Sequence, residues 1–375
     1  MTALPVTLAS VMAVLTVWVI HNLRGWPRPS RSGSGHALPH VSILVPARDE
    51  EHNIVRCLES LLRQEYPSFE VICLDDGSKD RTPQLLAELQ LRYPKLRVLE
   101  GADLPEGWVG KCFACHRLSE AADGRWLLFT DADTVHDPDM LAAHLRTALA
   151  REAGLLTGFP RVISRHALGW LTLPMLFFVI ALHLPLRRVE GARDPRFTAA
   201  HGAFMLYRRD VYDRIGGHAA FRGALVEDME MARAVKAAGE ALVLCDITER
   251  TGCEMYRHPA QIWDGFAKNL FPGLGRSTPL LAGLLLFYTL FYIAPLPAAA
   301  VLLPLGERPA ALAFLAVFLL GALQKAAVDR HFRVPGPWFL LVPASFTVLV
   351  LLAVRSWFLA FRGRDYVWKG RRYTP

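Results

Sequence analysis

The sequence is poor in charged residues and lacks the motifs of several common classes of protein. Asp, Glu, Lys and Arg make up 21% of its 375 residues, against 52% hydrophobic residues. The mean hydropathy of +0.24 is high for a soluble protein. No nucleic-acid-binding motif is present, so we expect no nucleic-acid partner. We attribute the net charge of +7 to basic residues beside membrane segments.

A second pair of cysteines at zinc-binding spacing is also missing. Cys112 and Cys115 form a single CxxC pair, whereas a structural zinc site is usually closed by a second pair of ligands. The other cysteines are scattered, several of them within predicted strands or helices. This distribution indicates reduced thiols in a cytosolic compartment rather than a zinc site.

The first apolar segment lacks the charge pattern of a secretory signal. Leu4 to Ile20 contains no charged residue and is just long enough to cross a bilayer. Basic residues follow it, at Arg24 and Arg28, whereas a signal peptide carries them before its apolar stretch. We therefore predict an uncleaved transmembrane anchor at residues 1–23 with its N-terminus outside. A linker at residues 24–40 and a cytoplasmic domain should follow.

A second apolar region, residues 276–361, is predicted to be a C-terminal transmembrane region. Its apolar stretches are Pro279–Leu305, Ala310–Leu323 and Trp338–Ala360. Three crossings would place the chain end outside, yet residues 362–375 form a basic tail of the kind that stays in the cytoplasm. We therefore expect the short stretch Ala310–Leu323 not to cross completely. The protein should be a multi-pass protein of the cell membrane.

Between these regions, residues 41–275 alternate short apolar strands with helical patterns. The predicted strands are Val41–Val45, Val71–Leu74, Leu96–Leu99 and Trp126–Phe129, and the predicted helices are Glu50–Gln64, Thr82–Tyr93, Gly110–Ala122, Pro138–Arg151 and Met229–Ala238. This alternation predicts an α/β domain with a mostly parallel sheet and helices on both faces. The apolar segment 168–186, which contains Pro174 and Pro185, is expected to be an interfacial helix or a lid over the acceptor site rather than a membrane span.

Acidic residues follow these elements at what should be one edge of the sheet. The strand Trp126–Phe129 ends in Thr-Asp-Ala-Asp, which presents Asp131 and Asp133. Ligands of open α/β sheets bind just beyond the carboxyl ends of the strands. Two carboxylates on such a turn can share Mg²⁺ or Mn²⁺, which would neutralise a diphosphate. The simpler alternative is a turn or a cap, and Glu227 and Asp228 would equally suit a helix N-terminus.

The order and spacing of these motifs resemble the inverting glycosyltransferase family 2, whose catalytic domain has the GT-A fold. The family elements PAxxE, DDGSxDxT, GK, DxD and ED stand here as PARDE, DDGSKDRT, GWVGK, DAD and VED. The resemblance covers residues 41–269. The GWVGK form is similar to membrane glycosyltransferases of hopanoid and carotenoid pathways. WKGRRY, at Trp368–Tyr373, is similar to the closing motif of those enzymes and of ceramide glucosyltransferases.

The resemblance implies a set of donor-binding residues at the first strand ends. Pro46, Ala47 and Glu50 would frame the nucleotide. Asp75 and Asp76 would bind it, and Asp76 would accept a hydrogen bond from the base.

It also implies the residues that carry the chemistry. Lys111 would lie against phosphate, Asp131 would face the ribose or the sugar, and Asp133 would bind the Mg²⁺ or Mn²⁺ that bridges the diphosphate. Asp228 would be the general base that takes the proton from the acceptor hydroxyl, with Glu227 as the second candidate. One base without an enzyme nucleophile implies inversion at the anomeric carbon.

One departure from the family pattern bears on the product. Processive synthases of the family carry a QxxRW element that is absent here, which favours a single transfer. Arg257 and Lys268 are weaker candidates for diphosphate contacts, and His201 with Gly202 for the border of the acceptor site.

The predicted function is a membrane-bound glycosyltransferase. It would move one sugar from a nucleotide sugar, expected to be a UDP-sugar, to the hydroxyl of a carotenoid, hopanoid or other membrane lipid. Two alternatives stay open: a processive glycan synthase, and a non-catalytic membrane binding module with a GT-A fold.

Overall fold

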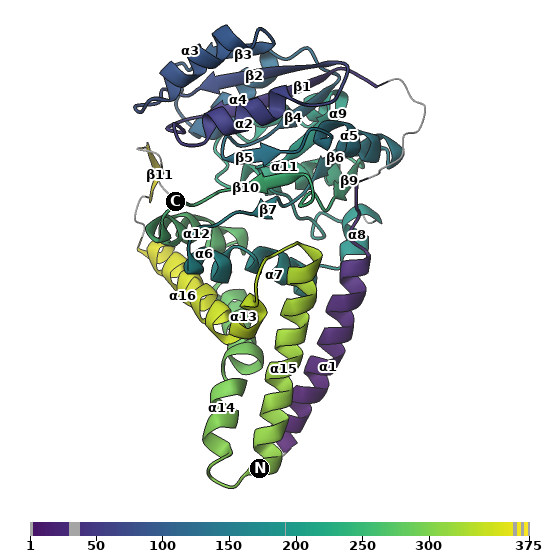
Figure 1. Cartoon of the computed structure of the whole chain (residues 1–375), viewed down its shortest axis with the longest axis vertical. Helices are drawn as coiled ribbons and strands as arrows, with labels where there is room; N and C mark the ends of the chain where they lie inside the picture. Colours follow the sequence, from purple (N-terminus) through teal and green to yellow (C-terminus); the bar gives the residue numbers. More distant parts are fainter. Residues whose placement is uncertain (1–2, 30–37, 192, 363–365, 369–370, 374–375) are drawn as a thin grey trace.

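The computed structural model describes residues 3–29, 38–191, 193–362, 366–368 and 371–373, the last two segments by their backbone alone. It consists of two regions (Figure 1). The sheet domain comprises all strands up to β10 with helices α2–α5 and α9–α11. The helical bundle comprises α1, α6–α8 and α12–α16, and extends away from the sheet domain.

The centre of the sheet domain is a seven-stranded sheet in the order β3-β2-β1-β4-β8-β6-β9. All neighbouring strands are parallel except around β8, which runs antiparallel to β4 and β6. The strands are β1 (Val41–Ala47), β2 (Phe69–Asp75), β3 (Leu96–Glu100), β4 (Trp126–Phe129), β6 (Ala153–Thr157), β8 (Met205–Arg208) and β9 (Ala241–Leu244). The predicted mostly parallel α/β fold is therefore confirmed.

Alternate residues of each strand enter different cores, because successive side chains point to opposite faces of a sheet. In β1, Ile43 and Val45 pack on one face, whereas Leu44 packs on the other. The covering helices are α2 (Ile54–Leu62), α3 (Thr82–Arg92), α4 (Gly110–Glu120), α5 (Met140–Ala150), α9 (Arg209–Arg214), α10 (Gly217–Ala220) and α11 (Glu227–Ala237). A second, three-stranded sheet contains β5 (Thr134–His136), β10 (Thr251–Cys253) and β7 (Arg161–Val162).

The segment 168–186 is not the single helix that the sequence predicts. It lies in α6 (Ala167–Thr172), α7 (Met175–His183) and α8 (Leu186–Gly191). The breaks fall at Pro174 and Pro185, because proline is favoured at or just before a helix start and not inside one. α7 packs between the sheet domain and α1, where Trp18 Nε1 donates to the carbonyl oxygen of Leu182 at 2.9 Å.

The bundle contains long and broken helices. Its members besides α6–α8 are α1 (Ala3–Arg24), α12 (Pro259–Gly273), α13 (Thr278–Tyr288), a π-helical turn (Thr289–Ile293), α14 (Pro295–Leu302), α15 (Arg308–His331), a 3₁₀ turn (Trp338–Leu341) and α16 (Val342–Phe361). In the part of the chain that the structure describes, three helices are long and apolar enough to cross a membrane: α1, α15 and the helix through Trp338–Phe361. A fourth follows if α12 and α13, bent by 116°, are counted as one span.

The helix that contains Ala310–Leu323 is longer than the sequence predicts, with 24 residues. α15 continues to His331, because the polar residues after Leu323 are buried between helices rather than exposed at a helix end. Gln324 donates to Thr16 Oγ1 at 3.0 Å and accepts from the Tyr292 hydroxyl at 2.8 Å. One turn further along, Lys325 and Asp329 form a buried ion pair.

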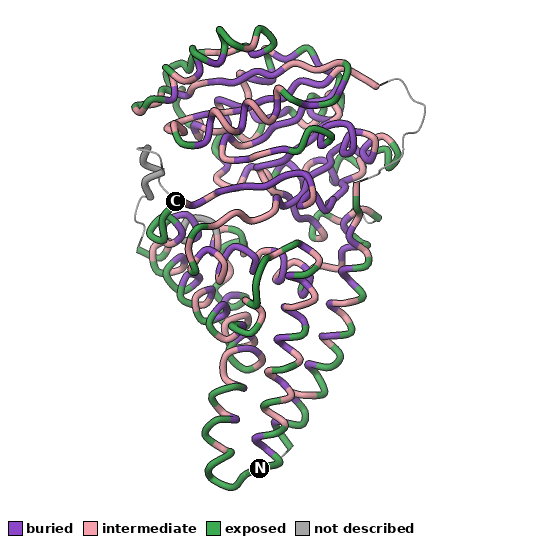
Figure 2. Tube along the Cα trace, viewed as in Figure 1, coloured by how far each residue is buried: buried purple, intermediate pink, exposed green. Residues whose placement is uncertain are grey.

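The bundle exposes apolar side chains where the sheet domain buries them. Among the described residues, every strongly exposed large hydrophobic residue except Leu91 lies in α1 or between Leu280 and Phe361. Exposed positions run along the outer sides of the helices in Figure 2. Such a surface suits lipid rather than water.

The basic tail is described only in part. β11 (Tyr366–Trp368) pairs antiparallel with β12 (Arg371–Tyr373). Residues 363–365, 369–370 and 374–375 lie outside the described residues, as does the linker segment 30–37. The motif at Trp368–Tyr373 is therefore known from its backbone, and not completely.

Candidate active site

The carboxyl ends of β1 and β2 bring the first two motifs side by side. In the parallel register, Ala47 lies opposite Asp75 and Pro46 opposite Leu74. Beyond the strand ends, the amide of Asp76 donates to the carbonyl oxygen of Ala47 at 2.8 Å. The residues predicted to bind the donor nucleotide at these two strands are thus close neighbours.

Hydrogen bonds between the loops that follow β1 and β2 fix the shape of this edge. The amide of Asp49 donates to Ser78 Oγ at 2.9 Å, and the amide of Glu50 donates to Thr82 Oγ1 at 2.8 Å. The Glu50 carboxylate accepts from the side-chain amide of Asn53 at 2.9 Å. Glu50 therefore helps to hold its own loop, in addition to the nucleotide contact predicted for it.

A cluster of opposite charges lies at the next strand end. Lys111, in the first turn of α4, places its Nζ 2.8 Å from Asp131 Oδ1 and 3.2 Å from Glu227 Oε1. Burial disfavours the lysine charge, but these two carboxylates outweigh it and hold the pKa of Lys111 well above its ordinary value. Lys111 thus links the DAD motif to the start of α11, a contact that the sequence did not predict.

Asp228, beside this cluster, is held by backbone amides. Its Oδ2 accepts from the amide of Gly202 at 2.8 Å and its Oδ1 from the amide of Met229 at 2.8 Å. Burial and then the neighbouring Glu227 raise the pKa of Asp228 to about 7, against the opposing effects of Lys111 and the two amides. A carboxylate that titrates near neutral pH suits proton transfer.

Gly202 lies against the charged cluster because it has no side chain. A Cβ atom at this position would lie only 2.8 Å from Lys111 Nζ. It would also be in van der Waals contact with the carboxylates of Glu227 and Asp228, at 3.5 and 3.6 Å. The sequence suggested Gly202 only as a border of the acceptor site. Its amide instead contacts the carboxylate predicted to be the base.

Asp133 lies apart from this cluster, beside β10. Its Oδ1 accepts from the thiol of Cys253 at 3.3 Å, and its carbonyl oxygen accepts from the amide of Glu254 at 3.1 Å. Within the described part of the chain, no group of three or more His, Cys, Asp or Glu side chains could hold a metal ion. A carboxylate oxygen nevertheless fits Mg²⁺ or Mn²⁺, which commonly bind one or two carboxylates together with substrate phosphates and water. The site therefore fits an ion that is shared with a diphosphate.

Sequence reasoning missed a buried carboxylate next to this position. Glu254 is 2% exposed and forms ion pairs with Arg165 at 2.6 Å and with Arg56 at 3.3 Å. These partners lie far from it in the sequence, so no local pattern could have indicated the contacts. Of the weaker candidates, Arg257 donates its amide to Gln261 Oε1 at 2.8 Å, and the side chain of Lys268 lies outside the described residues.

Comparisons with known proteins show which family the chain resembles. Residues 42–216 match the family described as "Glycosyl transferase family 2". Over 343 residues the chain is 26% identical to the 4,4'-diaponeurosporenoate glycosyltransferase of Staphylococcus aureus, covering 89% of this chain and 88% of that protein. It is 37% identical over 136 residues to the beta-monoglucosyldiacylglycerol synthase of Trichormus variabilis, covering 35% and 29% of the two chains.

The fold is also found in a solved structure. A mannosyltransferase from Pyrobaculum calidifontis, solved in complex with GDP-Man and Mn²⁺, superposes with a TM-score of 0.57 at 19% identity. The superposition covers 95% of this chain and 98% of the other. At this identity the likeness concerns the fold, which is that of a GT-A glycosyltransferase.

Proposed function

We propose that the chain, which matches glycosyltransferase family 2 over residues 42–216, transfers a single sugar, with inversion, from a nucleotide sugar to the hydroxyl of a membrane lipid. The observation that carries the proposal is Asp228: a partly buried carboxylate with a pKa of about 7, held by two amides at the rim of the sheet. A lipid acceptor follows the names of the relatives, and the hydroxyl follows one of them: monoglucosyldiacylglycerol carries its sugar on an alcohol, whereas diaponeurosporenoate is a carboxylate.

In this proposal Asp228 is the general base. As the acceptor oxygen attacks the anomeric carbon, its proton passes to Asp228 and the bond from that carbon to the diphosphate oxygen breaks. The nucleoside diphosphate leaves from the opposite face, so the configuration inverts. Glu227 is the weaker candidate, because its carboxylate is engaged by Lys111 at 3.2 Å.

Donor binding is proposed for the strand-end residues Pro46, Ala47, Glu50, Asp75, Asp76 and Asp131. Their support is the shared edge built by β1, β2 and the loops after them. Lys111 already contacts Asp131 and Glu227. In the proposal its ammonium group interacts with the donor phosphate as well as with these two carboxylates. A UDP-sugar remains our expected donor, and the GDP-Man complex of the structural relative makes GDP-sugars the first alternative.

We propose that Asp133 holds Mg²⁺ or Mn²⁺ together with the donor diphosphate. When bound, such an ion would neutralise negative charge on the leaving group. Asp133 itself supplies an oxygen ligand on a turn that is held by Cys253 and by the amide of Glu254.

We further propose that the bundle spans the cell membrane with the sheet domain in the cytoplasm. The C-terminal ends of α1 and α15 meet beside the sheet domain, where the rings of Trp26 and Phe332 are 4.6 Å apart. α13 and α14 lead away from that domain and α15 returns to it (Figure 1).

With the N-terminus outside, three passes through α1, α13–α14 and α15 would end in the cytoplasm. α16 then lies along α13 without a complete crossing: Phe346 stacks on Tyr292 at 4.2 Å, and Ser356 Oγ accepts from the amide of Phe271 at 2.9 Å. This arrangement keeps the basic tail on the cytoplasmic side, as its charge requires.

A donor and acceptor screen tests the proposed function. Full-length protein in lipid nanodiscs would receive Mn²⁺ or Mg²⁺, a panel of UDP- and GDP-sugars, and either a membrane lipid extract or no added lipid. We expect nucleoside diphosphate release and a glycolipid product that need both the metal and the lipid, and that are lost in Asp228→Asn. Release without any glycolipid would overturn transfer to lipid. Products that carry several sugars would support a processive synthase instead.

A further inference from the structure

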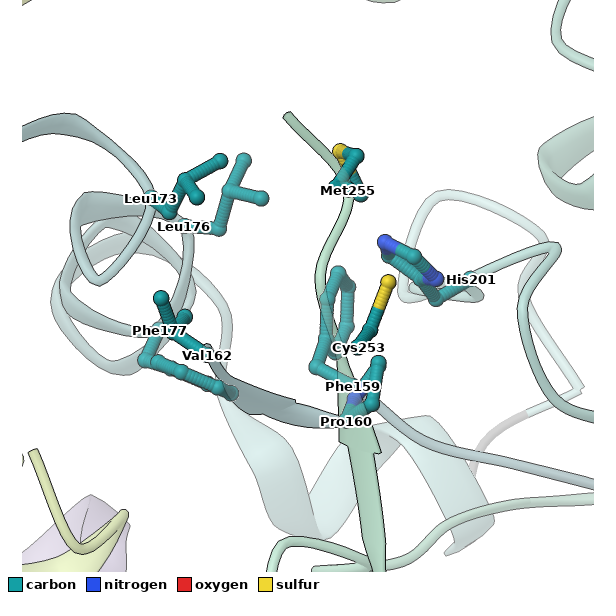
Figure 3. Close-up of a pocket in the computed structure, with 9 residues that line it drawn as sticks. All are labelled: Phe159, Pro160, Val162, Leu173, Leu176, Phe177, His201, Cys253 and Met255. Atoms are coloured by element: carbon teal, nitrogen blue, oxygen red, sulfur yellow. The ribbon is translucent and has the colours of Figure 1, made fainter. Parts of the chain in front are cut away.

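A mostly apolar pocket opens between α6, α7 and the site described above. Its walls include Phe159, Leu173, Leu176, Phe177, His201 and Cys253, which come from both the bundle and the sheet domain (Figure 3). The pocket is small: its empty volume of about 320 Å³ includes the open solvent at its mouth. A ligand can therefore place only a short apolar portion in it.

The pocket lies directly beside the reacting groups. Cys253, on one wall, donates its thiol to the proposed metal ligand Asp133 at 3.3 Å. His201, on another wall, precedes Gly202, whose amide binds the proposed base Asp228 at 2.8 Å. An apolar molecule in this pocket would end between these two carboxylates.

On its other side the wall of the pocket is continued by packed aromatic side chains toward the ends of the membrane-candidate helices. The rings of Phe159 and Phe177 are 6.2 Å apart, and Phe177 stacks on Phe332 at 4.2 Å. Phe332, at the end of α15, meets Trp26 after α1 at 4.6 Å. An unbroken row of aromatic rings thus joins the pocket to the bundle.

His201 places a hydrogen-bond donor in these apolar surroundings. The amide of Ala203 donates to His201 Nδ1 at 3.2 Å, so Nδ1 acts as the acceptor and the ring hydrogen is on Nε2. Burial lowers the pKa of His201 to about 4, which keeps the ring neutral in this tautomer. Figure 3 shows the far end of the ring, away from its own backbone, pointing into the pocket toward Met255.

We propose that this pocket binds the apolar part of the lipid acceptor next to its hydroxyl, and that His201 Nε2–H donates a hydrogen bond to the hydroxyl oxygen. This inference rests on the proposed function and names the acceptor subsite within it. The hydroxyl oxygen accepts from His201 while its hydrogen points to Asp228. With no lone pair free on Nε2, His201 orients the acceptor and does not compete for its proton.

The pocket is tested by filling it. Leu176→Trp would occupy the cavity, and Val179→Trp is the matched control on α7, away from the pocket. With nanodisc-embedded protein, Mn²⁺, the donor found active and dioleoylglycerol or lipid extract as acceptor, we expect Leu176→Trp to lower kcat/KM for lipid by about tenfold or more. Nucleotide affinity should be unchanged, and the control should behave like wild type. Equal kcat/KM for both Trp variants would overturn the pocket assignment.

The role of His201 is tested by two amides of different length. His201→Asn keeps an acceptor for the amide of Ala203 but removes the Nε2 donor, whereas His201→Gln keeps a donor at the Nε2 position. Loss of one hydrogen bond predicts a roughly three- to tenfold lower kcat/KM for lipid in the Asn variant, with recovery in the Gln variant and unchanged nucleotide affinity in both. The proposed role is wrong if Asn and Gln have the same effect. If wild type glycosylates no lipid, the proposed function itself fails, and that result is distinct from either.

Discussion

The sheet domain and the helical bundle place the same residue types in opposite environments. In the sheet domain large apolar side chains are buried, with Leu91 the one strongly exposed exception among the described residues, and the reactive carboxylates lie at a rim. In the bundle apolar side chains face outward, while Gln324, Lys325 and Asp329 are buried between helices. The polar groups to which we assign a function therefore lie at the rim of the first region, whereas those of the second stabilise the packing of its helices.

The largest expected effect tests whether the chemistry belongs to the sheet domain alone. Asp228→Asn removes the proposed base, so we expect kcat for sugar transfer to fall about 10²- to 10⁴-fold, with unchanged nucleotide affinity and thermal stability. Asp210→Asn, which also changes an acidic residue in a first helical turn, is the matched control. Transfer by Asp228→Asn within a few-fold of wild type would remove Asp228 from the mechanism.

The buried ion pair of α15 tests whether polar groups inside the bundle contribute to its stability. Asp329→Leu leaves Lys325 charged and unpaired, which we expect to lower the free energy of unfolding by about 3–5 kcal/mol. The double variant Lys325→Met/Asp329→Leu should recover most of that loss, because both charges are gone. In the sheet domain, Arg63→Ala breaks an exposed pair at 3.2 Å and should cost about 0.5 kcal/mol or less.

Unfolding of the purified variants in detergent micelles measures all three changes. If Asp329→Leu were as stable as wild type, water would have to reach Lys325. The interior of the bundle would then be hydrated at this position.

A pair of surface substitutions tests the outward faces directly. Leu319 on α15 is 55% exposed and Leu91 on α3 is 88% exposed. If α15 faces lipid, Leu319→Asp should cost roughly 2.5–3.5 kcal/mol of membrane insertion, whereas Leu91→Asp should leave insertion and activity unchanged. The fraction of protein that resists carbonate extraction from membranes reports the difference. Full retention of Leu319→Asp would argue against a lipid-facing α15.

The smallest effect is a pH dependence that only the rim should show. Because the pKa of Asp228 is raised to about 7, chiefly by burial and then by Glu227, the base is protonated and inactive below that pH. Transfer to a hydroxyl should rise about tenfold per pH unit up to about 7 and then level off. Glu227 and Lys111 lie beside Asp228 and affect its pKa, and neither residue is changed in this experiment. The residual transfer rate of Asp228→Asn should no longer rise with pH. If its pH–rate profile had the same shape as that of wild type, the titrating group would be a residue other than Asp228.

Most of the sheet domain could be predicted from the sequence, because local patterns determine it. Strand Trp126–Phe129 has the predicted bounds, and the other predicted strands and helices occur close to their predicted positions. The helix predicted from Glu50 starts only at Ile54, because Asp49 has a φ of +50° and Glu50 to Asn53 form a turn. The helical spacing of apolar residues does not show where such a turn ends and the helix begins.

The contacts within the site could not be predicted in the same way. Motif spacing placed Lys111, Asp131, Glu227 and Asp228 near one sheet edge, but the ion pairs of Lys111 and the amide of Gly202 depend on how α4, α11 and the segment before β8 pack. The length of α15 was misjudged for a related reason. Polar residues after Leu323 look like a helix end in the sequence, whereas the neighbouring helices bury them.

The row of rings from Phe159 to Trp26 has a consequence for how the enzyme meets its lipid. Moving each methylene group of an acceptor from the bilayer into water costs about 0.8 kcal/mol, so complete extraction of a long chain would be prohibitive. In the proposed mechanism, a pocket that adjoins the bundle lets the hydroxyl end reach Asp228 while the rest of the molecule stays in the membrane. The rate should then follow the mole fraction of acceptor among the surrounding lipids, as in surface-dilution kinetics, rather than its concentration in the bulk solution.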